Sequence, residues 1–407
     1  MREDMLADPE VKIKYASKYA SSSNYSKNCI GVRQAAAKLG IVERARQMEA
    51  DFNSWAAEKE DRQKEYGEVV DRRKTGVDSS YMKDVFEKQL LGSIYQIELA
   101  KIWMSFIQSM SMMAETDTLQ MMEFGLECLE EDYKDYSPET DRKVAKALLA
   151  WYRDNVNPAL WICLDEEKAL DEMDLDAYVD SLFDNSVFTS AEKLSAAIHE
   201  GGADVLRKDP AAGLGAGVVN SIMMLYMMSG DDYAQRNSQS LLMKGLMEMK
   251  KGKKVLYPDA NFTMRLTWGN VRSYEPRDGV FYDYYTTMDG IMEKDVPGDP
   301  EFSVPSRLRE LYESGDFGEY ALKDGRMPVC FLSTNDITGG NSGSPVLNAD
   351  GELIGLAFDG NWEAMSGDII FEDTLQRCIN VDIRYVLFVV DKFGGAGYLL
   401  DEMDMVR

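Results

Sequence analysis

Residues 338–346 place a serine where a nucleophile could work. The segment reads Thr-Gly-Gly-Asn-Ser-Gly-Ser-Pro-Val, with Ser342 at its centre. Glycine lets the backbone turn tightly, so the amide N–H groups of Gly340 and Ser342 can point at one spot. A carbonyl oxygen held at that spot becomes an oxyanion when the Ser342 hydroxyl attacks the carbonyl carbon. The residues predict acyl transfer; the other interpretation is a Gly/Ser/Asn turn formed for local reasons.

The loop around Ser342 is similar to the nucleophile loop of chymotrypsin-type serine peptidases. Such a serine needs a histidine as base and an aspartate to orient that histidine. The chain has one histidine, His199, and it ends a helical stretch that is followed by Glu200-Gly201-Gly202. The helix dipole and a glycine cap are sufficient reasons for a histidine there. We expect His199 to be structural and the base and its aspartate to lie outside this chain.

The residues that must position the loop change character near residue 254. Residues 9–254 have helical periodicity, as in the stripe Ile41, Ala45, Met48, Phe52 and Trp55. Later residues alternate or form short apolar runs, which is typical of strands. The sequence predicts an α+β protein with a helical domain at 1–254 and a β-rich domain at 255–407. Expected helices are 41–62, 80–113, 138–155, 174–183, 190–198, 211–249, 306–314 and 381–393; expected strands are 261–271, 280–287, 328–333, 346–347 and 352–358.

Composition excludes several classes of partner. The chain has 45 Lys and Arg against 71 Asp and Glu, for a net charge of −26. This argues against nucleic acid and anionic membrane surfaces, because both attract basic patches. No apolar run is expected to cross a membrane, and the first residues do not resemble a signal peptide. We expect no metal and no cofactor, because no cysteine lies in a CxxC or Cys/His cluster. The odd number of cysteines fits reduced, buried thiols, and one disulfide in an oxidising compartment is the alternative. The cysteines are Cys29, Cys128, Cys163, Cys330 and Cys378.

The chain resembles the serine dipeptidyl peptidases of peptidase family forty-six, the dipeptidyl peptidase seven and eleven type. The resemblance lies in residues 14–28, 261–269, 338–346 and 355–363, with Asp368 and 379–385. It implies a chymotrypsin-like double β-barrel interrupted by a large helical domain that caps the cleft. This chain is similar to the helical insertion followed by the C-terminal part of the barrels. The catalytic histidine, the catalytic aspartate and the export signal would precede it, so we expect the isolated chain to be inactive.

The resemblance also assigns roles to residues. Ser342 matches the nucleophile, and Gly340 with Ser342 the oxyanion hole. Asp359 and Asn24 match residues that hold the free ammonium group of a peptide substrate. Gly360 matches the position that sorts the family by specificity: an arginine there would pair with an acidic P1 side chain, whereas glycine favours bulky hydrophobic P1 residues.

The family resemblance extends to partners and location. It implies peptides with a free N-terminus as substrates, a periplasmic or cell-surface location, and a homodimer as one form of assembly. The family often has a second aromatic residue where this chain has Ser26. That departure concerns local packing and leaves the assignment unchanged.

Two alternatives stay open on sequence alone. A glutamyl-endopeptidase-like enzyme carries the same serine motif, but such enzymes are small and lack a helical domain. A non-catalytic helical binding protein with a degenerate peptidase domain would explain why the single His199 lies in a helical context. Asp359 could also be a turn-forming Asp-Gly, and Asn24 a helix-capping or loop residue.

Overall fold

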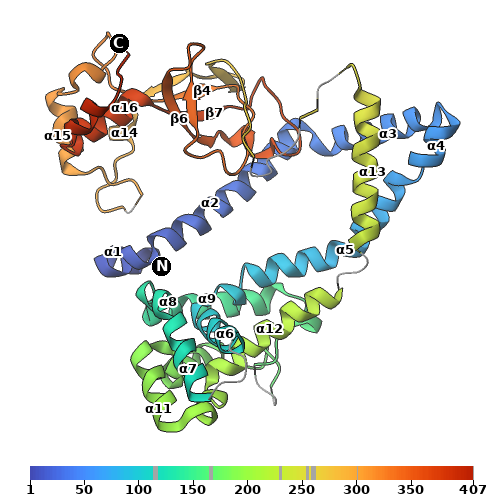
Figure 1. Cartoon of the computed structure of the whole chain (residues 1–407), viewed down its shortest axis with the longest axis vertical. Coiled ribbons are helices and arrows are strands. Elements are labelled where there is room, and N and C mark those ends of the chain that lie inside the picture. Colours follow the sequence, from blue (N-terminus) through green and yellow to red (C-terminus); the bar gives the residue numbers. More distant parts are fainter. Residues whose placement is uncertain are drawn as a thin grey trace. The chain divides into compact units, whose positions relative to one another are not determined.

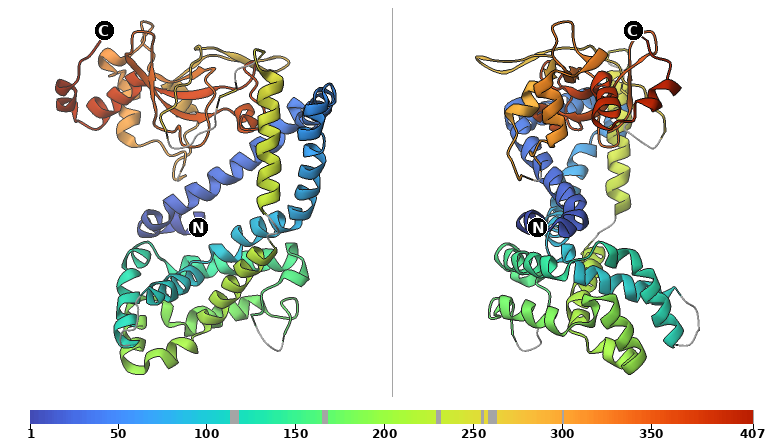
Figure 2. Two further views of the ribbon diagram at one scale, coloured as in Figure 1. Left: turned by 45° about the vertical axis from the view of Figure 1, so that its right-hand side comes forward. Right: turned by 90° about the vertical axis from the view of Figure 1, so that its left-hand side faces the viewer.

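The computed structural model describes residues 1–112, 118–164, 168–228, 232–253, 256–257, 263–299 and 301–406 (Figures 1 and 2). Contacts divide the chain into a helical unit, Met1–Tyr19 with Phe52–Lys251, and a nucleophile unit, Ala20–Asp51 with Gly252–Arg407. The predicted domain boundary between residues 254 and 255 lies outside the described residues. Residues 20–51 were expected in the helical domain, but they pack with the C-terminal residues.

The chain is rich in helices and contains small antiparallel sheets. In the helical unit, α1, α4 and α8 are short, and one long helix, α2, continues into the nucleophile unit. The helices up to residue 250 are α1 (Arg2–Ala7), α2 (Pro9–Leu39), α3 (Ile41–Ala57), α4 (Glu60–Tyr66), α5 (Val69–Leu91), α6 (Glu98–Ser111), α7 (Thr118–Cys128), α8 (Glu130–Lys134), α9 (Pro138–Asn155), α10 (Leu175–Asn185), α11 (Ala191–Arg207), α12 (Pro210–Met228) and α13 (Asp232–Lys250).

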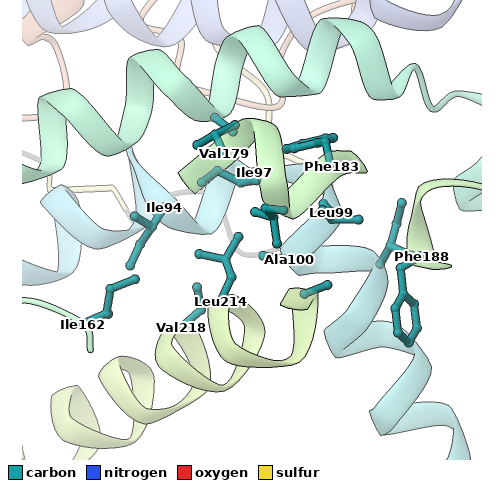
Figure 3. Packing of buried hydrophobic residues seen from close by; sticks show 14 of the residues in the cluster. Ile94, Ile97, Leu99, Ala100, Ile162, Val179, Phe183, Phe188, Leu214 and Val218 are labelled. Atoms are coloured by element: carbon teal, nitrogen blue, oxygen red, sulfur yellow. The ribbon is translucent and has the colours of Figure 1, made fainter. Parts of the chain in front are cut away.

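The core of the helical unit lies between α6, α10 and α12. Leu99, Ala100 and Phe106 of α6 are fully buried, as are Leu214 and Val218 of α12. Figure 3 shows these helices turning their apolar side chains toward one another. Burial on this scale supplies the main stabilisation of a helical bundle, because each fully buried aliphatic side chain contributes about 1.5–3 kcal/mol.

Helix α12 corrects one expectation from the sequence. Its residues Pro210–Met227 are long and apolar enough to cross a membrane, although no such run was expected. Length and composition alone are weak evidence, because a core helix of a soluble protein passes the same test. Ala211, Leu214 and Val218 are buried in the core, which accounts for the apolar character of this face.

The predicted helix 80–113 is two helices, and the reason is a long-range cap. Helix α5 ends at Leu91, and α6 begins at Glu98. The Asp141 carboxylate of α9 accepts hydrogen bonds from the peptide N–H of Glu98 at 3.0 Å and of Leu99 at 2.9 Å. These N–H groups have no partner inside α6, so the carboxylate caps the helix. The cap comes from 43 residues away, where helical periodicity gives no sign of it.

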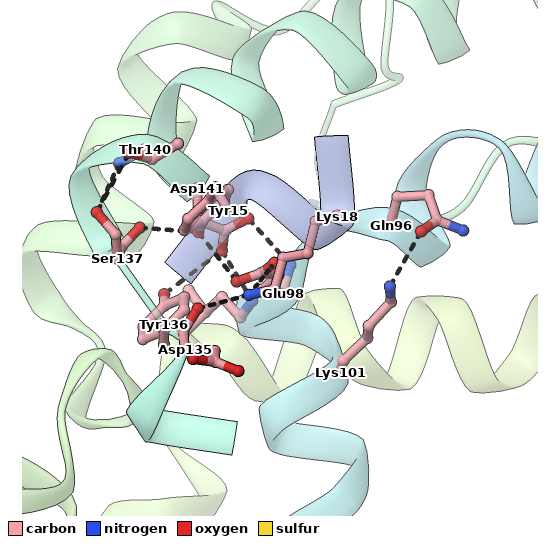
Figure 4. A network of polar contacts seen from close by, with 11 residues as sticks. Tyr15, Lys18, Gln96, Glu98, Lys101, Asp135, Tyr136, Ser137, Thr140 and Asp141 are labelled. Carbon is pink, nitrogen blue, oxygen red and sulfur yellow. Dashed lines mark hydrogen bonds and ion pairs between the residues drawn. The ribbon is translucent and has the colours of Figure 1, made fainter. Parts of the chain in front are cut away.

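The first half of α2 is fixed near the same point (Figure 4). The Tyr15 hydroxyl donates to Glu98 Oε2 at 3.0 Å and to the Ser137 carbonyl at 3.2 Å. Lys18 Nζ forms an ion pair with Glu98 Oε1 at 2.8 Å and donates to the Asp135 carbonyl at 2.6 Å. Burial raises the pKa of the Tyr15 hydroxyl, so it stays a donor at every physiological pH.

In its described residues, the nucleophile unit contains two antiparallel sheets. One has two strands, β1 and β2; the other has five in the order β3-β4-β7-β6-β5. Helices α14 to α16 bury Met288, Leu311 and Phe388 in a second core. The elements are β1 (Tyr274–Arg277), β2 (Val280–Tyr282), β3 (Tyr285–Thr287), α14 (Met288–Glu293), α15 (Ser306–Ser314), β4 (Pro328–Ser333), β5 (Pro345–Leu347), β6 (Leu353–Gly360), β7 (Cys378–Asp382) and α16 (Ile383–Phe388), followed by a π-helical turn at Val389–Phe393.

Three predictions for this unit were wrong, and one of them is the single strand 280–287, which the structure divides into β2 and β3. Residues 263–270 form no strand, and Val271 makes only an isolated bridge to Ser333; residues 261–262 lie outside the described range. The helix expected from residue 381 begins at Ile383, because Asp382 is the last residue of β7 and its carboxylate caps the helix by accepting from the Arg384 N–H at 2.9 Å. The predicted helix 306–314 is confirmed.

We predict that Asp141 makes the stability of the helical unit depend on pH. Burial raises its pKa to about 7. The folded state therefore binds the proton more tightly than the unfolded state, and this contribution is complete below about pH 4 and lost as pH rises through 7. Asp141→Asn cannot ionise and also loses one acceptor. Its deficit in free energy of unfolding should be largest near pH 4.5 and shrink toward pH 8, by up to about 4 kcal/mol.

Chemical denaturation at fixed pH values measures this deficit. The neighbouring Asp135→Asn is the matched control, because the Asp135 side chain is exposed. A deficit of Asp141→Asn that is the same at pH 4.5 and pH 8 would contradict the assignment.

Candidate active site

Ser342 lies on the loop between β4 and β5, and its side chain is exposed. Its hydroxyl donates to the Phe358 carbonyl of β6 at 3.4 Å. Within the loop, Asn341 Oδ1 accepts from the Thr338 N–H at 3.1 Å, and the Ser344 N–H donates to the Asn341 carbonyl at 2.9 Å. Asn341 therefore closes two small turns, one at 338–341 that precedes the serine and one at 341–344 that contains it.

Hydrogen bonds join this loop to strand β6. The Gly343 N–H donates to the Ala357 carbonyl at 2.8 Å, and the Ala357 N–H donates to the Ser344 carbonyl at 2.9 Å. Strand β5 then pairs with β6, with Pro345 opposite Leu356. Since backbone hydrogen bonds are directional, these contacts fix Ser342 relative to the end of β6.

The backbone around Ser342 has the flexibility that an oxyanion hole needs. Gly340 has φ = 104° and Gly343 has φ = 84°, in the region that favours glycine. Among the described residues, the peptide N–H groups of Gly340 and Ser342 form no hydrogen bond to another group. Two donors are thus left for a ligand, as the oxyanion-hole prediction requires, and that role itself stays a prediction.

Strand β6 carries a bulge immediately before Asp359. Ala357 pairs with Asn380 of β7 and Asp359 pairs with Ile379, so Phe358 has no partner in the ladder. A bulge bends the strand and breaks the alternation of faces. Phe358 and Asp359 are consequently both exposed, although they are adjacent. The Phe358 carbonyl, which lies outside the ladder, is the group that accepts from Ser342.

The strand ends at Gly360, which contacts the turn that follows. This turn, η5 (Trp362–Ser366), is a 3-10 helix. A Cβ atom at Gly360 would lie 2.9 Å from Ala364 Cβ and 3.0 Å from Met365 Cε. Both distances are below an ordinary van der Waals contact, so the absence of a side chain at residue 360 is required for this packing.

Asn24 lies in the second half of α2 and is exposed. Asn24, Asn28 and Gly31 follow the i, i+4, i+7 spacing and therefore share one face of the helix. That face contacts η5, because Asn28 Nδ2 lies 3.6 Å from Met365 Sδ. The helix face that includes Asn24 therefore contacts the segment that follows Asp359. Asn24 itself lies about two helical turns (about 10 Å) along the helix axis from Gly31.

Two ion pairs attach this part of α2 and the start of α3 to the same unit. Lys38 Nζ pairs with Glu363 of η5 at 3.0 Å and also donates to the Pro276 carbonyl. Arg44 pairs with Glu372 at 3.3 Å. Glu363 is mostly shielded from solvent, with 12% of its side chain exposed, so the first pair is less screened than a typical surface pair.

His199 belongs to the other unit, in α11. Its Nδ1 lies 2.8 Å from the Ser195 carbonyl one turn earlier, and its Nε2 lies 3.3 Å from Glu123 of α7. Both ring nitrogens are thus engaged within the helical unit. This arrangement supports the structural role expected for His199.

The cysteines differ from the expectation that they are buried. None of the five, all of which are described, forms a disulfide; Cys378 is buried and Cys330 half-buried, whereas Cys29, Cys128 and Cys163 are exposed. Burial raises the pKa of the Cys378 thiol to about 11, which makes it unreactive. In the described part of the chain, no group of three or more His, Cys, Asp or Glu side chains is placed to hold a metal ion.

Sequence reasoning missed the contact between η5 and α2. The contributing residues, Gly31 and Met365, lie in a helix and a turn whose sequences contain no catalytic or binding motif at these positions. One signal was present: a glycine in a helix interior costs about 1 kcal/mol relative to alanine, which suggests that something packs closely there. The partner of Gly31 is 334 residues away and has no motif of its own.

Comparison with known proteins identifies relatives along the whole chain. A family model described as Peptidase S46 matches residues 1–405. A dipeptidyl-peptidase 7 of Phocaeicola vulgatus is 43% identical over 425 residues, which cover 100% of this chain and 57% of that protein. An Asp/Glu-specific dipeptidyl-peptidase of Porphyromonas gingivalis is 39% identical, with 100% and 57% covered. The chain spans a little over half the length of these relatives.

Solved structures show the same architecture of helices with small antiparallel sheets. DPP11 of Porphyromonas endodontalis in complex with the dipeptide Arg-Glu has a TM-score of 0.86 at 34% identity, over 99% of this chain and 58% of that one. The same protein in an alternate conformation has a TM-score of 0.73 at 31% identity, over 96% and 60%.

We predict that Asn341 supports the loop through its side-chain oxygen. Asn341→Ala removes the acceptor for the Thr338 N–H and should lower the free energy of unfolding by about 1 kcal/mol. Because Ser342 follows directly, labelling of Ser342 by a fluorophosphonate should also slow. Asn341→Asp keeps an oxygen acceptor and is the matched control. Equal effects of the two substitutions on labelling would contradict this role.

Proposed function

This chain belongs to the peptidase S46 family, and we propose that it forms the nucleophile-bearing part of a serine dipeptidyl peptidase. The observation that carries the proposal is the pair of hydrogen bonds that joins the Ser342 loop to β6, the strand that ends in Asp359 and Gly360. A nucleophile and two candidate substrate-binding residues thereby belong to one rigid backbone arrangement. The chain spans 57% of the length of each of these two relatives.

In the proposed reaction, the Ser342 hydroxyl attacks the carbonyl carbon of the second residue of a peptide. A base accepts the hydroxyl proton, and the N–H groups of Gly340 and Ser342 stabilise the oxyanion. Collapse of this intermediate breaks the C–N bond, and the proton goes to the leaving amine. Water then attacks the acyl-enzyme, releases the dipeptide and returns the Ser342 proton.

We propose that the base comes from residues outside these 407. The chain has one histidine, and His199 is held by Ser195 and Glu123 in the helical unit. Without a general base, attack by serine loses about 10²–10⁴ in rate. The 407-residue chain by itself should therefore release dipeptides at a negligible rate.

Release of dipeptides requires a device that recognises the substrate ammonium group at a fixed distance from Ser342. We propose that the Asp359 carboxylate pairs with this ammonium and that the Asn24 side-chain oxygen accepts one of its hydrogens. Asp359 is exposed beyond the bulge of β6, and its Oδ1 accepts only from the Gly360 N–H at 2.7 Å among the described residues. Two extended residues span about 7 Å, so the ammonium would reach the end of β6.

Gly360 supports a preference for hydrophobic P1 residues. It provides no positive charge for an acidic side chain, and its neighbours Ala364 and Met365 are apolar. The relatives include a protein named dipeptidyl-peptidase 7 at 43% identity and one named Asp/Glu-specific at 39% identity. These two identities are too similar to decide between an apolar and an acidic P1 residue. The preference is therefore argued from the residues around Gly360.

The antiparallel sheet around Ser342 supports a further proposal, that it is part of a chymotrypsin-like double β-barrel. Five of its strands are described, in one antiparallel sheet. The rest of the barrels would come from outside this chain. An exported location, periplasmic or at the cell surface, and a homodimer are proposed on the family resemblance alone.

We predict that a free substrate N-terminus is essential. Acetylation of the N-terminal amine of a peptide substrate should abolish release, because the ammonium partner of Asp359 is lost. Asp359→Asn should lower kcat/KM for the free peptide by roughly 10- to 150-fold, the equivalent of one hydrogen bond to a charged group. The measurement is dipeptide release by the protein that carries this chain, with Ser342→Ala as the inactive reference.

A glutamyl-endopeptidase-like enzyme would cleave the acetylated peptide as well as the free one. That result would reject the dipeptidyl peptidase proposal and retain the role of Ser342. Asp350→Asn is the matched control for Asp359→Asn, because Asp350 is an exposed aspartate in the turn before β6 and should not affect kcat/KM.

A further inference from the structure

Met365 contacts the bare side of Gly360, together with Ala364. Its terminal methyl carbon, Cε, lies 3.0 Å from the point where a Cβ of residue 360 would be. Met365 is half-buried, so part of its side chain faces solvent next to the end of β6. The methionine therefore fills the space that a larger residue at position 360 would need.

The other side of Met365 contacts α2. A methyl group on Gly31 would overlap Cγ of Met365 and would lie 2.9 Å from its Cβ and 3.3 Å from a ring carbon of Trp362. Asn28 Nδ2 also lies 3.6 Å from the Met365 sulfur. Met365 is thus packed between the helix that carries Asn24 and the strand that carries Asp359.

Hydrogen bonds of two polar side chains fix the turn that carries Met365. Asn361 Oδ1 accepts from the Ala364 N–H at 3.0 Å and from the Arg377 N–H at 2.9 Å. The Arg377 side chain is 1% exposed, and its guanidinium donates to five backbone carbonyls, those of Arg272, Ser273, Asp373, Thr374 and Gln376. A buried arginine whose donors are all used fixes its surroundings firmly. The backbone position of Met365 is therefore fixed by these contacts.

We propose that Met365 forms the floor of the P1 pocket and determines, together with Gly360, which P1 side chains fit. This inference rests on the proposed dipeptidyl peptidase function, and it adds a specificity residue that touches the substrate. A methionine floor is apolar and flexible, so it adapts to aliphatic and aromatic side chains. It also excludes a long side chain at position 360, so the two positions must be changed together to alter the charge preference.

Substitution of Met365 tests the size of the pocket. The protein that carries this chain is assayed with free-N-terminus dipeptidyl amides whose P1 residue is Ala, Leu, Phe or Glu. Met365→Ala deepens the pocket and should raise the ratio of kcat/KM for Phe over Ala by about tenfold, the scale of one or two methylene groups in a pocket. Met365→Leu keeps the volume and should change the ratio less than about threefold.

Coupling between Met365 and Gly360 is the second arm. Gly360→Arg alone should lower kcat/KM for every P1 residue, because the arginine collides with Met365. In Gly360→Arg/Met365→Ala the guanidinium has room, and kcat/KM for P1 Glu should rise at least about tenfold over the single variant. Met403→Ala is the matched control: this methionine of the same unit is 50% exposed, and its loss should change no ratio.

The outcomes separate the two proposals. If the wild-type protein releases no dipeptide from any substrate, the proposed function fails and this inference fails with it. If it does release dipeptides, equal changes for all P1 residues in Met365→Ala, or strictly additive effects with Gly360→Arg, overturn the inference alone. Fluorophosphonate labelling of Ser342 in each variant shows whether the site is folded. If Met365→Ala does not label, the smaller truncation Met365→Val should raise the same Phe over Ala ratio, and an unchanged ratio in that variant overturns the inference.

Discussion

Two backbone hydrogen bonds between the Ser342 loop and strand β6 hold the serine in place. They run from the Gly343 N–H to the Ala357 carbonyl and from the Ala357 N–H to the Ser344 carbonyl. The bulge at Phe358 follows directly, so the strand leaves its ladder at the point where it meets the serine. Everything proposed about the substrate uses this geometry: a reacting carbonyl at Ser342 implies a chain that runs along the end of β6 toward Asp359. An insertion between Ala357 and Asp359 would separate Ser342 from the residues that are proposed to bind the substrate ammonium.

Helix α2 supplies the second constraint. It is a single helix of 31 residues, and each half is held within its own unit by specific contacts. Tyr15 and Lys18 bind Glu98 in the helical unit. Gly31 and Lys38 bind η5 in the nucleophile unit through Met365 and Glu363. The sequence of α2 has almost no amphipathic stripe, so it does not show that both halves make contacts. The reason is that these contacts involve a few residues with polar neighbours.

Much of the local structure could be predicted. Helices 138–155 and 306–314 and strand 328–333 follow from capping residues and periodicity, and the structure has all three. The break between α5 and α6 could not be predicted, because the Asp141 carboxylate that caps α6 comes from a different helix. Residues 263–270 alternate as a strand does but have no partner strand among the described residues, so periodicity alone was misleading. In the site, a sequence motif identified Ser342. Met365 could not be identified in this way, because it has no motif and its partner Gly31 is far away in the sequence.

A crystal structure of the protein that carries this chain, with a dipeptide product whose C-terminal residue is leucine or phenylalanine, tests the proposed binding mode directly. The proposed binding mode places the dipeptide ammonium within hydrogen-bond distance of Asp359 and Asn24. Its carboxylate should lie at Ser342, close to the Gly340 N–H, and its apolar side chain should rest against Met365. A dipeptide bound with its ammonium away from Asp359, or with its side chain directed away from Met365 and Gly360, would contradict it.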